Sequence, residues 1–495
     1  MGRSSRSASL VVKLFWTLNG LYLLLAGLYL SNASKALLLG IACLTAVLTV
    51  LLCMCDPLHG LYLTILATHL GPVVRTELIA VGMVTLGDIH LLILMTGFTF
   101  RAMKQGRFSL GPFSAAMALL AFFSILTVAF ASDFRSVTAG AISQIQVAIV
   151  YFLTINLVRQ EKDAALLLRM IGFAVVVSAT MHIVAYAQGR TLLLSMQEIG
   201  NDVVSQYEEI QWTLNLIYNK TSFFYGSFIA SCTVGMTLAA THLTLSTERP
   251  RLLAFWAIVG LAALLSSLVG GNRTPLVATG VSCAIILGVL LRKFPRKKWI
   301  FRRIIMICIV GPIMLATAFF LQWSITKEAQ FESFRIMFME TAWDSMSERF
   351  LMWRAAMDYV IRFPKEFLIG VGPDVLTRGA KLSVVQLMMN IPGLSIQLPS
   401  FHNFYIDVIF QNGIFFFSIA AYIIAATLTE LVRRFSRLDD SIARDCLFAL
   451  LAWLVMWNSH ATGWSKPVLI LSEILGLAHI VIINRMHPYR FIRNR

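Results

Sequence analysis

Residues 401–428, FHNFYIDVIFQNGIFFFSIAAYIIAATL, are long and apolar enough to predict a helix that crosses a membrane. Two polar residues, His402 and Asn403, lie side by side where this helix is expected to begin, and Asp407 follows about one turn later. Imidazole and amide groups are costly to place in hydrocarbon. We therefore expect this end of the helix to face water, protein or a bound molecule.

Apolar segments of this kind recur along the whole chain. The 495 residues are 58% hydrophobic and 13% charged, with a mean hydropathy of +0.76, which excludes a soluble globular protein. We predict an all-α, polytopic membrane protein of about fourteen transmembrane helices, with residues 1–495 forming a single membrane domain. The spans are expected near residues 14–31, 36–55, 59–75, 78–100, 110–131, 138–158, 166–187, 221–245, 252–271, 275–291, 304–322, 402–430, 446–464 and 467–484.

One part of this assignment has two solutions. Residues 59–100 fit either two spans or one span plus a re-entrant piece.

Positive charge is concentrated in the segments that join alternate spans. The chain has 41 Lys and Arg against 25 Asp and Glu, and most of these basic residues fall on the inner side if the N terminus is cytoplasmic. The positive-inside rule therefore predicts that both termini are cytoplasmic. The basic segments are short and adjoin the spans, without interleaved stacking aromatic residues, so they indicate topology signals and contacts with membrane lipids, and no nucleic-acid partner.

Two outer segments are long enough to form structure of their own. They are residues 188–220 and the larger loop 323–401, and long loops in compact architectures are usually functional. Within the larger loop, residues 347–364 have the pattern of a helix that stops at Pro364. Gly370 and Gly372 then permit a tight turn.

Five ionisable residues lie inside predicted spans, which makes them candidates for ion or proton transport. They are scattered, and the first two are two residues apart, so they point in different directions on a helix. We predict that they are satisfied by packing or by water, and that they do not form a proton path. These residues are Asp88, His90, His182, Glu473 and His479.

Three motifs lie on the outer side of the predicted membrane domain. The first is an Arg at the outer junction of two spans, the second an Arg helix that leads to a Gly turn, and the third a His-Asn pair that begins a span. Their residues are Arg273; Arg349, Trp353, Ala356, Pro364, Gly370 and Gly372; and His402, Asn403 and Gly413. In their content, order and shared side, these motifs resemble the superfamily of O-antigen ligases and Wzy-type polysaccharide polymerases. The resemblance covers about residues 250–430.

Two departures from the family pattern concern the acceptor more than the reaction. Thr274 and Pro275 follow the first Arg, and Asp407 and Gln411 replace commoner residues around the His helix.

The resemblance implies a glycan transferase of the bacterial inner membrane, with its active site and both outer segments on the periplasmic side. The donor would be a glycan on a polyprenyl diphosphate carrier such as undecaprenyl diphosphate, and the acceptor a hydroxyl of a glycan or of a lipid core. Proteins of a polysaccharide assembly complex would be further partners. No cofactor is implied, and the outer segments lack a DxD motif or clustered His and Cys residues, so no metal site is predicted.

The chemistry of the motif residues suits this reaction. Arg273 and Arg349 are the candidate diphosphate clamp, because a guanidinium stays charged and binds phosphate oxygens bidentately. His402 is the candidate base for the acceptor hydroxyl. These three residues are the predicted catalytic set. The candidate substrate-binding residues are Asn403, Gly372, Trp353 and Asp407.

Two other classes of function fit a chain of this kind. A flippase or other transporter of lipid-linked oligosaccharides would place its functional charges within the spans, between two pseudo-symmetric halves. A non-catalytic scaffold of a polysaccharide assembly complex would tolerate replacement of both Arg349 and His402. Within the transferase class, the motifs do not separate a ligase from a polymerase or from an enzyme that glycosylates proteins.

Overall fold

The computed structural model describes residues 2–31, 33–70, 75–78, 82–105, 108–130, 134–187, 225–245, 250–269, 274–293, 350, 353–354, 356–372, 403–434, 441–457 and 469–486. Apart from one β-hairpin, the regular structure in these residues is helical, which confirms the all-α prediction. The helices are α1 (Gly2–Leu30), α2 (Lys35–Cys55), α3 (Pro57–Leu70), α4 (Leu86–Gln105), α5 (Ser114–Ala129), α6 (Phe134–Leu157), α7 (Glu161–Ala187), α10 (Tyr225–Leu245), α11 (Pro250–Val269), α12 (Thr274–Lys293), α16 (Pro364–Ile369), α19 (Phe404–Arg434), α20 (Ser441–Trp457) and α21 (Leu469–Met486).

The helices make this a polytopic membrane protein. Within the described residues, 7 helices are long and apolar enough to cross a membrane, namely α1, α2, α4, α6, α7, α11 and α19. Shorter apolar helices lie in α5, α12 and α21. The predicted span 304–322 lies outside the described residues, so the total of about fourteen spans stays a prediction.

The ambiguous region, residues 59–100, contains a single helix of full span length. Helix α3 has 14 residues. At 1.5 Å per residue it is roughly 21 Å long, shorter than a hydrocarbon core of about 30 Å. Strands β1 (Arg75–Leu78) and β2 (Gly82–Thr85) then form an antiparallel hairpin, and α4 begins only at Leu86. The predicted span 78–100 was therefore wrong at its start, because its first apolar residues pair as strands.

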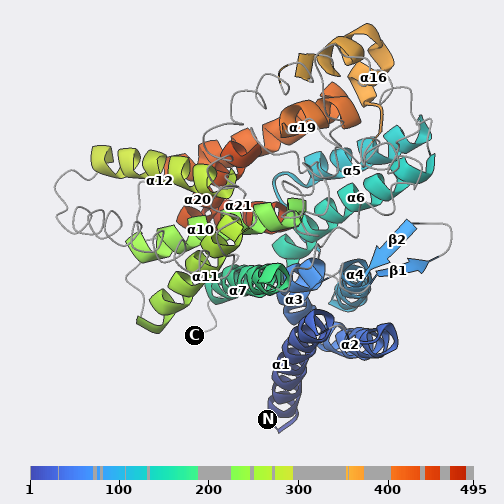
Figure 1. Cartoon of the computed structure of the whole chain (residues 1–495), viewed down its shortest axis with the longest axis vertical. Helices are drawn as coiled ribbons and strands as arrows, with labels where there is room; N and C mark the ends of the chain where they lie inside the picture. The colour runs from blue at the N-terminus through green and yellow to red at the C-terminus, as the bar shows by residue number, and fades with distance from the viewer. Residues whose placement is uncertain are drawn as a thin grey trace.

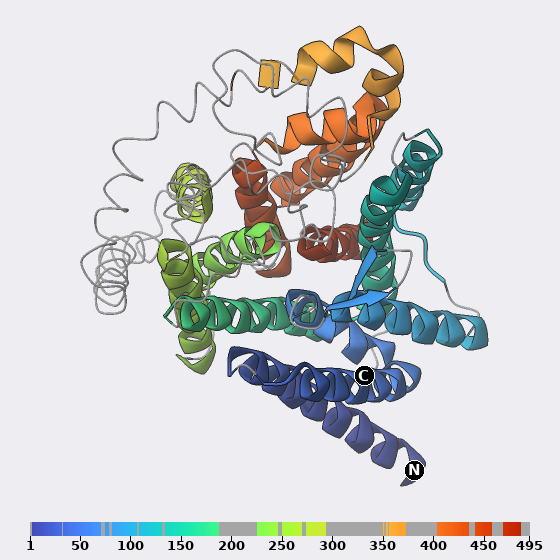
Figure 2. The ribbon, with the colours of Figure 1, turned by 45° about the vertical axis from the view of Figure 1, so that its right-hand side comes forward.

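Burial distinguishes the centre of the bundle from its periphery. In the spans of α6 and α7, 78% and 67% of residues are buried, against 33% and 28% in α1 and α2. Figures 1 and 2 show α1 and α2 at one end of the molecule, and α16 with the neighbouring part of α19 at the opposite end, beside α5 and α6. The apolar side chains of α1 and α2 that remain exposed suit contact with lipid.

Four of the five ionisable residues inside the spans form hydrogen bonds within the bundle, as predicted. Buried polar groups need such partners, because leaving one unsatisfied in hydrocarbon costs a free energy on the order of several kcal/mol. The bonds join Asp88 to Gln146 (2.8 Å), His90 to Tyr22 (3.0 Å) and to the Gly60 carbonyl (2.9 Å), His182 to Ser266 (2.7 Å), and His479 to Tyr151 and Thr427 (2.8 Å each).

The fifth residue, Glu473, is packed within the bundle without such a bond in the described part of the chain. Its side chain is fully buried in α21, and neither carboxylate oxygen has a hydrogen-bond partner among the described residues.

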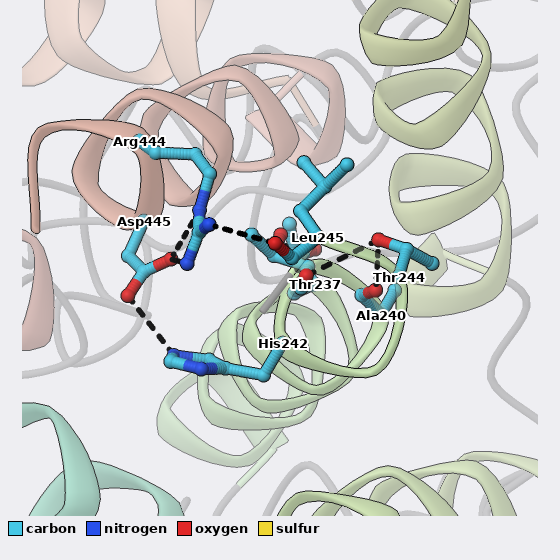
Figure 3. A network of polar contacts seen from close by, with 8 residues as sticks. Thr237, Ala240, His242, Thr244, Leu245, Arg444 and Asp445 are labelled. Carbon is cyan, nitrogen blue, oxygen red and sulfur yellow. Dashed lines mark hydrogen bonds and ion pairs between the residues drawn. The ribbon is translucent and has the colours of Figure 1, made fainter. Parts of the chain in front are cut away.

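A buried polar network joins α10 to α20 (Figure 3). Asp445 lies 2.9 Å from Nε2 of His242 and 3.3 Å from the guanidinium of Arg444, which also donates to the carbonyl of Leu245. The His242 ring stacks on Trp256, with ring centroids 4.3 Å apart. The network fixes the end of α10 to the start of α20, two ends that the predicted topology places on the inner side.

Asp56 forms a second connection between helix ends on that side. It lies between α2 and α3, its carboxylate is 3.0 Å from both His59 and Arg101, and it accepts a hydrogen bond from the Leu58 N–H. Burial alone would raise the pKa of Asp56, but the hydrogen bond and charge of His59 and the charge of Arg101 outweigh it and hold this pKa below its usual 3.8.

Replacing Asp56 with Asn should therefore lower stability near neutral pH. A carboxyl with a depressed pKa stabilises the fold above its unfolded-state pKa, and that contribution is lost as the pH falls through the lower folded-state value. We expect a loss of about 1 kcal/mol at pH 7, because the ion pair is only partly buried. Thermal unfolding in detergent should show this difference at pH 7 and a shrinking difference below about pH 4. Equal stability of the two proteins at pH 7 would contradict it.

Candidate functional site

The sequence-predicted site residues divide into two groups. Arg273, Arg349 and His402 lie outside the described residues. The structure does describe Trp353, Gly372, Asn403 and Asp407, and it places them in two segments that pack together. We call residues 353–372 the loop segment and residues 403–412 the entry segment.

Helix α19 is interrupted at Gly413. This residue has φ 79° and ψ 172°, a conformation that is essentially restricted to glycine. The entry segment is thus a short helix of its own, and the apolar helix continues after the glycine. The predicted span over residues 402–430 is thus present, with a break at Gly413 that helical periodicity does not report.

Asn403 caps the entry segment. Its side-chain oxygen accepts hydrogen bonds from the backbone N–H groups of Tyr405 (3.0 Å) and Ile406 (3.2 Å), which have no partner within the helix. The side chain is 92% buried, so this end of the helix is held by the protein. The cap fixes the direction in which the chain enters from His402.

Three polar residues form a stripe along the entry segment. Asn403, Asp407 and Gln411 are spaced by four residues, which places them on one face of a helix, and all three are buried. Asp407 is only 1% exposed and has polar partners within the protein. The stripe therefore faces protein and not lipid.

The loop segment packs on a different part of the entry segment. Ala356, Val360 and Phe410 form a buried apolar cluster, to which Trp353 and Ile406 add partly buried side chains. The helix of the loop segment runs to residue 362, which agrees with the predicted stop at Pro364. Pro364 also begins the short helix α16, which the sequence analysis did not predict. The structure thus brings the second and third motifs into direct contact. Arg349 precedes Trp353 by four residues, and His402 precedes Asn403.

Backbone hydrogen bonds join the same two segments. The N–H of Val371 donates to the carbonyl of Phe410, and the N–H of Gly372 to the carbonyl of Gln411, both at 2.9 Å. Gly370 and Gly372 have positive φ, which confirms the predicted turn. The N–H of Gly372 is already used by Gln411, and the N–H groups that follow it lie outside the described residues.

The two segments are attached to α5 and α6. Thr127 donates to the carbonyl of Ile369 (3.2 Å), and Lys365 donates to the carbonyl of Phe130 (2.9 Å). The side-chain amides of Gln144 and Asn412 bond to each other twice, at 3.0 and 2.9 Å. Sequence reasoning missed all of these residues. Two sequence features could have indicated the Gln144–Asn412 contact: a Gln inside an apolar span, and an Asn directly before Gly413.

The two segments also lie within the part of the chain that is similar to a known protein family. Residues 257–421 match the family model described as O-antigen ligase. Over these residues, about a third of the chain, the protein is similar to O-antigen ligases. No curated protein matches the chain at a significant level. The match includes both segments and the positions of Arg273, Arg349 and His402.

An apolar groove is lined by residues that closely follow Asn403 in the sequence. It has a volume of about 190 Å³ and runs along α19 next to α20. Phe404 and Tyr405, the two residues after Asn403, are part of its lining, and the Tyr405 hydroxyl donates to the Leu454 carbonyl. The other lining residues are Phe417, Ala420, Ala421, Ile424, Ala425, Leu428 and Leu454.

Charges elsewhere on the loop segment face outward. Arg354 is 81% exposed and lies 3.9 Å from Asp358, and Arg362 is also exposed. Exposed pairs of this kind contribute little to stability. Within the described residues, no group of three or more His, Cys, Asp or Glu is placed to hold a metal ion.

Proposed function

We propose that this protein transfers a glycan from a polyprenyl diphosphate carrier to a hydroxyl acceptor, at the outer face of the bacterial inner membrane. The observation that carries the proposal is the packing of the loop segment on the entry segment, around Ala356, Val360 and Phe410. This contact draws together the two motifs that contain Arg349 and His402. A further support is the family match over residues 257–421.

The reaction breaks the bond between the anomeric carbon and the diphosphate oxygen, and the bond electrons remain on the diphosphate. Arg273 and Arg349 would bind and stabilise that growing negative charge, the main catalytic requirement of such a transfer. The acceptor oxygen attacks the anomeric carbon while His402 takes its proton. Neither step requires a metal or a cofactor.

The remaining candidate residues would position these groups. Asn403 caps the helix that follows His402, so it orients the base through the backbone. Trp353 follows Arg349 by four residues and packs against the cluster of Ala356, Val360 and Phe410. Gly372 lies at the contact between the two segments, through its hydrogen bond to Gln411, and Asp407 lies on the buried polar stripe of the entry segment. Both are proposed to meet the substrate.

The apolar groove suits the carrier lipid of the donor. It begins one residue after Asn403 and is lined by aliphatic and aromatic side chains along α19. A polyprenyl chain bound there would have its diphosphate near the start of the entry segment. The acceptor would be a growing polysaccharide or a lipid-core sugar, so the protein would act as a polymerase or as a ligase.

The test is glycan transfer by purified protein in proteoliposomes that contain a polyprenyl-diphosphate-linked glycan and a soluble hydroxyl acceptor. We expect transfer, and we expect Ala421→Trp to raise KM for a long-chain donor about tenfold, equivalent to about 1.4 kcal/mol, with little change in kcat. Tryptophan would fill the groove and exclude part of the lipid chain.

Ala426→Trp is the matched control, because Ala426 lies on the same helix but does not line the groove. It should leave KM unchanged. Movement of labelled donor across the bilayer without any transfer would overturn the proposal in favour of transport. Equal effects of the two Trp variants would overturn the assignment of the groove.

A further inference from the structure

The loop and entry segments form one unit through a mutual approach of two glycines. Gly370 has φ 80° and ψ 171°, nearly the same torsion angles as Gly413. A Cβ on Gly370 would meet the Gln411 carbonyl oxygen at 2.2 Å, and one on Gly413 would meet the Leu368 carbonyl oxygen at 2.3 Å. Each glycine thus lies against the residue two positions before the other, and the backbones pack with local twofold symmetry.

The loop and entry segments contact α6 directly beside these two glycines. Asn412 directly precedes Gly413, and its side chain is 1% exposed. Its partner Gln144, on α6, is 3% exposed. Each amide donates to and accepts from the other, so the pair satisfies two donors and two acceptors in a buried setting.

Such a pair fixes orientation as well as distance. An amide that is rotated or shifted loses one of its two hydrogen bonds, and a buried amide without a partner is costly. An apolar contact would tolerate sliding at this position, because hydrophobic attraction is not directional. The pair therefore specifies one register between the entry segment and α6.

We propose that Gln144 and Asn412 are positioning residues that lock the paired segments onto α6 and so hold the groups before Asn403 and Trp353 in place for the reaction. This inference rests on the proposed function for its catalytic consequence. The entry segment is a short helix, capped at its start by Asn403 and closed at its end by Gly413. A displacement at Asn412 is thus transmitted as a rigid body to the opposite end, next to His402.

The experiment compares four variants: Gln144→Leu, Asn412→Leu, the double Leu variant, and the exchange Gln144→Asn with Asn412→Gln. Each single variant leaves one buried amide without its partner, so its unfolding temperature should fall by several degrees. The double Leu variant removes both amides, and its unfolding temperature should return close to that of the wild type. The exchange variant can form the same two bonds.

Two readouts separate positioning from a purely structural role. In the double Leu variant, we expect kcat for transfer to fall at least tenfold with KM for the donor nearly unchanged, and the exchange variant to regain most of kcat. Hydrogen exchange at Val371 and Gly372, whose N–H groups bond to the entry segment, should become at least tenfold faster in the double Leu variant than in the wild type or the exchange variant.

The outcomes are distinct for the two proposals. A double Leu variant with wild-type kcat, or with wild-type exchange at both amides, would overturn the positioning role. A wild-type protein that performs no transfer would overturn the proposed function, and hydrogen exchange would still decide whether the pair locks the segments onto α6.

Discussion

Replacing His402 with Ala is expected to reduce glycan transfer by a factor of about 10² to 10⁴, the usual contribution of a positioned general base. The acceptor hydroxyl would still bind and approach the anomeric carbon, but its proton would have no nearby acceptor. The loss should therefore appear in kcat. Because an imidazole ordinarily titrates near pH 6.5, the wild-type rate should rise through that region, and the remaining rate of the variant should not.

The same variant can be examined in the native host, after its level in the membrane has been checked. We expect glycan to accumulate on the polyprenyl carrier and to disappear from the cell surface. Long carrier-linked chains would identify a ligase, and single repeat units a polymerase. Gel analysis of both glycan fractions distinguishes these results.

Arg354→Ala is the control within the same loop. Its side chain is 81% exposed and makes only a long contact with Asp358. It should leave transfer within about twofold of the wild type, as expected for a surface substitution. Unchanged surface glycan in the His402 variant would remove His402 as the base and favour transport or scaffolding.

The helices were predictable because their signal is local. Apolar runs of about 20 residues identify spans, and Pro364 predicts the end of a helix because proline lacks an N–H. The Gly turn at residues 370–372 was predictable for the same kind of reason. The hairpin at residues 75–85 was not, because its strands lie within a stretch whose hydropathy also fits a helix.

The parts of the candidate site that were missed depend on contacts distant in sequence. Gln144 and Asn412 are separated by 268 positions, so no local pattern pairs them. Asn403 is predicted to bind substrate, and the structure shows in addition that it caps the entry segment, a role for which Asn is favoured. The close packing of Gly370 and Gly413 against each other's segments likewise depends on the tertiary fold, so the sequence does not predict it.

Gly413→Ala should be among the most destabilising single substitutions in the chain. The φ of 79° with ψ of 172° disfavours any residue with a Cβ, at a cost of roughly 1 to 3 kcal/mol. The new Cβ would also lie 2.3 Å from the Leu368 carbonyl oxygen and 2.5 Å from the Ile369 nitrogen. Both are backbone atoms, so no side chain can rotate away, and the loop segment must separate from the entry segment.

Gly370→Ala should have the same effect by symmetry, because its Cβ would meet the carbonyl of Gln411 and the nitrogen of Asn412. We expect each variant to lower the unfolding temperature in detergent by several degrees and to abolish transfer. The double variant should be little worse than either single one, because one separation relieves both collisions and the two sites are not independent.

Gly280→Ala is the matched control. Gly280 lies within α12, and a Cβ there would have no atom within 4 Å. Alanine should be neutral or stabilising by up to about 1 kcal/mol, because glycine inside a helix is entropically unfavourable. Wild-type stability of Gly413→Ala would mean that the chain does not reverse at this residue. The entry segment would then be continuous with the rest of α19, and the contact that brings the Arg and His motifs together would lose its basis.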